Sequence, residues 1–114
     1  MSNVTTINTE GLQGRLAGKE RLELWNVLTD EYFKHEMIPG SRRAPVDQVG
    51  REVARAAFAK DTPIVVYCAG PSCPASRQAA EKLVTLGFTR VEAYEGGLEQ
   101  WKAAGLPIEQ LATV

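Results

Sequence analysis

Two cysteines, Cys68 and Cys73, are the only thiols of this 114-residue chain, and they lie five positions apart. The apolar run "PIVVY" precedes Cys68, the residues "AGPS" separate the two cysteines, and the helix-like run "PASRQAAEKL" follows them. Thiols at this spacing can be a nucleophile and its partner, a disulfide, part of a metal site or small packing residues. The elements around them decide between these readings.

The bulk composition predicts one globular domain spanning residues 1–114, with 44% hydrophobic and 24% charged residues. A net charge of −1 indicates neither a nucleic-acid-binding nor a membrane-binding surface. No run approaches the roughly 18 apolar residues of a membrane span. The first residues lack the pattern of an export signal, so we expect a cytoplasmic protein. In that reducing compartment, cysteines are reactive thiols or metal ligands more often than structural disulfides.

Short apolar runs alternate with amphipathic segments along the chain, which predicts parallel β–α units in a three-layer α/β/α domain. The predicted strands are Val4–Ile7, Leu22–Val27, Pro63–Tyr67 and Arg90–Tyr94. The predicted helices are Thr9–Ala17 with Thr9 as its cap, a short one capped by Thr29, Val46–Phe58, Pro74–Leu86 and one within Gly96–Gly105. Because Pro63–Tyr67 is apolar without alternation, we expect it to be a central strand covered on both faces.

Cys68 follows this central strand directly and precedes the helix that begins near Pro74. In an open parallel sheet, ligands bind beyond the carboxyl ends of the strands. Backbone N–H groups of the loop and of the first helical turn favour an anion there. The sequence therefore predicts that Cys68 is a nucleophile with a pKa below the usual thiol value.

Four stretches of the chain together resemble the single-domain rhodanese family of sulfurtransferases. They are "VTTINTEGL", "LELWNVLTDEYFKHEMIPGSRRAPVD", "PIVVYC" and "SRQAAEKLVTLGFTRVEAYEGGLEQWKAAGLPIE". The resemblance implies the rhodanese-like fold with a mainly parallel five-stranded sheet. It also implies that Cys68 takes a sulfane sulfur from a donor such as thiosulfate or a persulfide. The sulfur then passes to a thiol or to cyanide, and neither a metal nor an organic cofactor takes part.

The expected cradle for the persulfide is the loop Ala69, Gly70, Pro71, Ser72 and Cys73. It is similar to family variants that read Cys-x-Gly-Pro-x-Cys, and it lacks the arginine of the common form. Arg77 is the cation nearest to the loop and a possible electrostatic helper. We expect its side chain to lie in solvent.

Three further positions depart from the family pattern. Asn26 and Leu28 stand in place of an Asp and an Arg that often form a charge pair, and Met37 stands in place of a common His. These positions leave open how active the protein is. Because thiosulfate is a dianion, a loop without a fixed cation favours a less charged donor, such as a persulfide on another protein.

Other functions stay open at this point. A phosphatase needs an arginine that closes the cysteine loop, and this loop has none. A thiol–disulfide protein would use Cys73 as a resolving thiol for Cys68. A zinc site needs four ligands, whereas the chain has two cysteines and the distant His35. A non-catalytic binding domain would keep the fold without using the thiol.

Overall fold

A five-stranded parallel sheet forms the centre of the computed structural model, which describes residues 4–18 and 21–111. Across the sheet the order is β1 (Thr5–Thr6), β6 (Val91–Tyr94), β5 (Ile64–Tyr67), β2 (Glu23–Asn26) and β4 (Arg42–Arg43). A separate antiparallel pair joins β3 (Glu36–Met37) to β7 (Glu109–Gln110). The predicted fold class, with a mainly parallel five-stranded sheet, is therefore confirmed.

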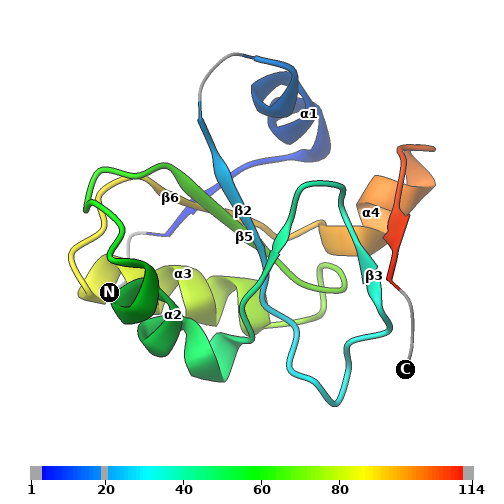
Figure 1. Cartoon of the computed structure of the whole chain (residues 1–114). Coiled ribbons are helices and arrows are strands. Elements are labelled where there is room, and N and C mark those ends of the chain that lie inside the picture. The colour runs from blue at the N-terminus through cyan, green and yellow to red at the C-terminus, as the bar shows by residue number, and fades with distance from the viewer. Residues whose placement is uncertain (1–3, 19–20, 112–114) are drawn as a thin grey trace.

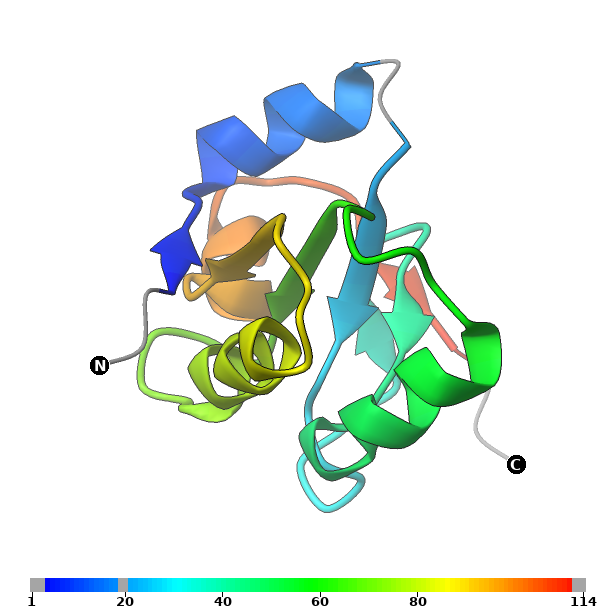
Figure 2. The ribbon, with the colours of Figure 1, turned by 90° about the vertical axis from the view of Figure 1, so that its left-hand side faces the viewer.

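Four α-helices cover the two faces of this sheet. They are α1 (Thr9–Ala17), α2 (Val49–Ala56, preceded by the 3₁₀ turn Val46–Gln48), α3 (Ala75–Thr85) and α4 (Gly97–Ala103). Figures 1 and 2 show α1 and α4 on one face and α2 and α3 on the other, which gives the predicted three layers. In the part of the chain that the structure describes, no helix has the length and apolar character needed to cross a membrane.

Two neighbouring strands hold the central strand β5 in place, and hydrogen bonds fix its carboxyl end. It lies between β2 and β6, and all four of its side chains are fully buried, which explains its unbroken apolar pattern. At its last residue, the Tyr67 hydroxyl accepts a hydrogen bond from the Ile38 N–H at 3.0 Å. The same hydroxyl lies 2.7 Å from Ser41 Oγ. These bonds tie the carboxyl end of β5 to the turn beside it.

Helix α3 covers the sheet beside β5 and β6 with small and branched side chains. Ala79, Ala80 and Leu83 are fully buried on its inner face. The helix begins at Ala75 and ends at Thr85, within one residue of the predicted bounds. Gly87 follows with a φ of 101°, a left-handed conformation that suits glycine. Because α3 starts only seven residues after Cys68, its packing on the sheet also anchors the cysteine loop.

Two predicted helix starts are wrong. The N-cap of α1 is Asn8, whose side chain accepts from the Gly11 N–H at 2.7 Å, whereas the Thr9 hydroxyl pairs with Tyr94. After Thr29 the chain makes one turn in place of a helix, and the Thr29 carbonyl accepts two N–H groups at 3.0 Å. The strands β3, β4 and β7 were not predicted, because two residues are too few for an alternating pattern.

Candidate active site

Cys68 lies directly after β5, at the carboxyl edge of the sheet, and its side chain is fully buried (0% exposed). A turn closes the loop over it, because the Cys73 N–H donates to the Gly70 carbonyl at 3.0 Å. This turn places the Cys73 carbonyl 3.3 Å from Cys68 Sγ, where it accepts a hydrogen bond from the thiol. Ala69, Gly70, Pro71, Ser72 and Cys73 thus form one loop over the sulfur, as the sequence predicts.

The start of α4 supports the loop from the other side. The Leu98 N–H donates to the Cys68 carbonyl at 3.0 Å, and the Glu99 N–H donates to the Ala69 carbonyl at 2.8 Å. Gly97 makes this approach possible with a φ of 59°. A Cβ atom on Gly97 would lie 2.8 Å from the Ala69 carbonyl carbon, closer than real Cβ contacts allow. The loop after β5 and the glycine turn after β6 are therefore built to fit each other.

Gly70 is a second point of close approach within this loop. A Cβ atom there would meet the Glu99 side chain, whose own Cβ would be 3.1 Å away. The absence of a side chain at Gly70 therefore lets α4 approach the loop closely. The neighbour is a carboxylate-bearing side chain of α4.

The pKa of Cys68 is raised, so the prediction of a lowered value is wrong. Removal from water is the largest cause, because a buried thiolate loses its hydration. The Cys73 side chain raises the pKa further. The backbone N–H and the hydroxyl of Ser76, in the first turn of α3, act in the opposite direction. The helix start therefore favours the thiolate as expected, but burial outweighs it.

Ser76 is a site residue that the sequence reasoning missed. Its side chain is fully buried, and its Oγ forms no geometrically defined hydrogen bond with a described residue. The hydroxyl is nevertheless near enough to Cys68 to lower the pKa of that thiol, so the Cys68 thiolate is the partner that suits it. Ser76 is the second residue of the helix that follows the cysteine loop, and this position in the sequence was the available signal.

Two pockets flank the cysteine loop, one at each of its ends. The first has a volume of about 320 Å³ and includes Ala69 and Leu98 in its lining. The second has a volume of about 200 Å³ and includes Cys73 and Pro74. Leu28 and Tyr32 line both pockets. Cys68 itself lines neither pocket and has no exposed surface.

Two of the cations near the loop, Arg77 and Lys102, pair with carboxylates, whereas Lys34 lines the first pocket beside Ala69. Arg77 Nε donates to Glu95 at 3.0 Å, and its side chain is about half exposed, so the structure gives it a partner outside the loop. Lys102, at the rim of the first pocket, pairs with Glu36 at 3.0 Å. Glu99 packs against Gly70, and the five loop residues themselves include no cation.

The positions that depart from the family pattern have structural partners of their own. Asn26 is fully buried, and its Oδ1 accepts from the Leu28 N–H at 3.1 Å while its Nδ2 donates to the Glu36 carbonyl at 3.4 Å. These bonds hold the turn after β2 without a charge pair. Leu28 is buried beside both pockets, and Met37 is buried in β3. Of these positions, Leu28 alone contributes an apolar wall to the pockets beside the loop.

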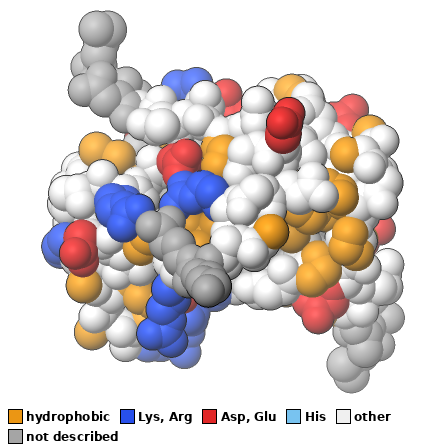
Figure 3. All heavy atoms as spheres, turned by 90° about the horizontal axis from the view of Figure 1, so that it is seen from above, with side chains coloured by type: hydrophobic (Ala, Val, Ile, Leu, Met, Phe, Trp, Pro, Cys, Tyr) orange, Lys and Arg blue, Asp and Glu red, His pale blue; other side chains and the backbone are white. Residues whose placement is uncertain are grey.

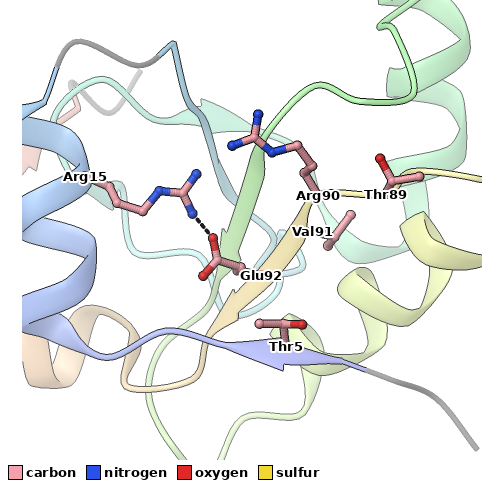
Figure 4. Close-up of a pocket in the computed structure, with 6 residues that line it drawn as sticks. All are labelled: Thr5, Arg15, Thr89, Arg90, Val91 and Glu92. Atoms are coloured by element: carbon pink, nitrogen blue, oxygen red, sulfur yellow. Dashed lines mark ion pairs between the residues drawn. The ribbon is translucent and has the colours of Figure 1, made fainter.

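The opposite edge of the sheet carries charged side chains. Figure 4 shows a pocket of about 330 Å³ there, in which Arg15 pairs with Glu92 of β6. A neighbouring pocket of about 590 Å³ includes Arg21, Arg42 and Arg90. Figure 3 shows Lys and Arg side chains gathered toward this end of the molecule. These charges lie where β6 begins, so they do not act on the loop after β5. Among the described residues, no group of three or more potential ligands could hold a metal ion.

The fold and the site define an α/β domain with one buried cysteine at the end of its central strand. The rhodanese-like domain model matches residues 9–104, so the chain belongs to the rhodanese-like domain family. A sulfurtransferase of Allochromatium vinosum is 32% identical over 105 residues, covering 92% of this chain and 94% of that protein.

Two further proteins are similar to this chain over different shares of its length. The thiosulfate sulfurtransferase GlpE of Actinobacillus pleuropneumoniae is 44% identical over 50 residues, covering 43% of this chain and 44% of that protein. The crystal structure of the BH2092 protein from Bacillus halodurans superposes with a TM-score of 0.81 at 27% identity. That alignment covers 93% of this chain and 77% of the other.

Proposed function

We propose that this protein is a sulfurtransferase in which Cys68 carries a sulfane sulfur as a persulfide. The observation that supports this most strongly is the position of Cys68 at the end of β5, beneath a loop bounded by α3 and α4. Relatives that are named sulfurtransferases support the same reading. A cytoplasmic location, expected from the sequence, would supply thiol acceptors in reduced form.

The proposed reaction has two steps. The Cys68 thiolate first attacks the outer sulfur of a donor persulfide, forming Cys68–S–SH and releasing the donor as a thiol. An acceptor thiolate then attacks the outer sulfur, and Cys68 leaves as a thiolate. The Cys73 carbonyl stabilises the resting thiol by accepting a hydrogen bond from it. The N–H and hydroxyl of Ser76 are the donors suited to the anionic forms, because both lower the pKa of Cys68.

The charges around the loop favour a persulfide donor over thiosulfate. A dianion would meet the Glu99 side chain beside Gly70 and no unpaired cation in the loop itself. The walls of the two flanking pockets include the apolar side chains of Leu28, Tyr32 and Leu98, and the first pocket also has two lysines and two glutamates in its lining. Tyr32 is 65% exposed, so an apolar contact is available to the body of a larger donor. We therefore propose a persulfide carried on a protein as the donor.

Intact-mass spectrometry of the wild type and the Cys68→Ala variant tests this function. After incubation with glutathione persulfide, we expect one added sulfur, or the products of its onward transfer, only when Cys68 is present. Thiosulfate at the same concentration should load Cys68 more slowly. Equal uptake by Cys68→Ala would contradict the role of Cys68, and failure of every sulfane donor would leave a non-catalytic binding domain as the better interpretation.

A further inference from the structure

Cys73 has a different environment from Cys68 although both belong to one loop. Cys68 is fully buried, whereas Cys73 is half-buried and lines the pocket of about 200 Å³ at the end of the loop. Its neighbours in that pocket include Tyr32 and Pro74. Its side chain also packs against the core cluster that contains Cys68. Cys73 is therefore a thiol that solvent can reach and that the fold holds beside the buried cysteine.

The geometry of the loop brings Cys73 back onto Cys68 Sγ. The Gly70–Cys73 turn reverses the chain, and the Cys73 carbonyl lies 3.3 Å from that sulfur. The two side chains also interact, because Cys73 contributes to the raised pKa of Cys68 through a hydrogen bond and through charge. The structure joins neither cysteine in a disulfide.

We propose that Cys73 resolves the Cys68 persulfide and releases its sulfur as hydrosulfide, an activity that rests on the proposed function. The Cys73 thiolate attacks Cys68 Sγ, the inner sulfur of the persulfide. The Cys68–Cys73 disulfide bond forms, the bond to the outer sulfur breaks, and that sulfur leaves with the electron pair as HS⁻. The sulfane sulfur is reduced, and the two cysteine thiols are oxidised to the disulfide, so no external oxidant is needed. Two equivalents of a small thiol, such as glutathione, then reduce the disulfide.

Two considerations favour attack at the inner sulfur over transfer of the outer sulfur to Cys73. The Cys73 carbonyl lies 3.3 Å from Cys68 Sγ, and the Cys73 side chain interacts with the same thiol, whose sulfur is the atom to be attacked. Thiol–disulfide exchange is faster when the leaving thiol has the lower pKa. Because burial raises the pKa of Cys68, Cys68 is the poorer leaving group and hydrosulfide the better one. The loop would thus turn a sulfur carrier into a persulfide reductase that depends on thiols.

The experiment compares the wild type with Cys73→Ser, after both are treated with glutathione persulfide and rapidly desalted. We expect Cys73→Ser to retain a persulfide on Cys68 with a lifetime at least about tenfold longer than in the wild type, since the internal thiol reacts at high effective concentration. The wild type should instead contain a Cys68–Cys73 disulfide. Hydrosulfide trapped with bromobimane should match that disulfide in amount, above the Cys73→Ser background. Thr85→Ser, an exposed change at the end of α3 and outside the cysteine loop, is the control and should behave as the wild type.

The outcomes separate this proposal from the function on which it rests. Equal persulfide lifetimes in the wild type and Cys73→Ser, with Cys73 still open to alkylation, would overturn the resolving role and leave the sulfurtransferase intact. A disulfide between two chains, which would form faster at higher protein concentration, would also overturn it. Absence of sulfur uptake by both proteins would overturn the proposed function together with this inference.

Discussion

Substitution of Gly97 by alanine tests the fit between the cysteine loop and α4. Gly97 has a φ of 59°, and alanine in the left-handed region costs about 1–2 kcal/mol. The new Cβ would also lie 2.8 Å from both the Ala69 carbonyl carbon and the Gly70 nitrogen. Backbone atoms cannot rotate away, so overpacking adds about 1–3 kcal/mol. We expect Gly97→Ala to lower the free energy of unfolding by about 2–5 kcal/mol, the sum of the two effects.

Gly105→Ala is the matched control, because Gly105 has a φ of 74° but no heavy atom within 4 Å of the position that a Cβ would take. Gly105→Ala should lower the free energy of unfolding only by the cost of alanine in the left-handed region, about 1–2 kcal/mol. Urea unfolding measures both variants, and the slope of the free energy against urea should stay unchanged. Uptake of sulfur by Cys68 should fall in Gly97→Ala alone. Equal destabilisation of the two variants would refute the claim that the loop and α4 are closely fitted.

Three further substitutions probe the site and its support. Tyr67→Phe leaves a buried backbone N–H without its acceptor and should destabilise the protein by about 1–3 kcal/mol in urea unfolding, whereas Tyr32→Phe, on an exposed side chain, should change little. Ser76→Ala removes a donor that lowers the pKa of Cys68, so the pH profile of Cys68 alkylation should shift to higher pH, while Thr85→Ala, at the exposed end of α3, should leave it in place. An unshifted profile in Ser76→Ala would exclude that role. Arg77→Gln breaks an exposed ion pair and should alter stability by less than about 1 kcal/mol. A large loss of sulfur uptake in Arg77→Gln would restore Arg77 as an electrostatic helper.

Elements with strong patterns were predictable from the sequence. The unbroken apolar run of β5 and the apolar face of α3 gave their positions to within one residue, because burial alone decides such patterns. Short elements were not predictable. Each of β3, β4 and β7 has two residues, and its pairing depends on segments far away in the chain. The helix expected after Thr29 failed for a similar reason, since one capping residue and one apolar edge are insufficient without a surface on which to pack.

The candidate site was predictable in outline but not in its electrostatics. The strand–cysteine–loop–helix order indicated that Cys68 follows a central strand at the carboxyl edge of the sheet, because topology sets that edge. The roles of Cys68 and its loop stay predictions. The direction of the pKa shift depends instead on how completely the loop excludes water, which no local pattern reports. The role inferred for Ser76 also required the structure, since a serine in a first helical turn is common and its burial is not visible in the sequence.

Transfer of sulfur to cyanide by loaded protein tests the central claim most directly. The Cys73→Ser variant, which cannot form the internal disulfide, is loaded with glutathione persulfide, desalted and mixed with cyanide. We predict thiocyanate in an amount equal to the sulfur bound before mixing, with loss of the added mass from Cys68. A protein that lacks both thiols, Cys68→Ser with Cys73→Ser, should yield none. Thiocyanate at the same level from that protein, or bound sulfur on Cys68 that cyanide cannot remove, would contradict the account.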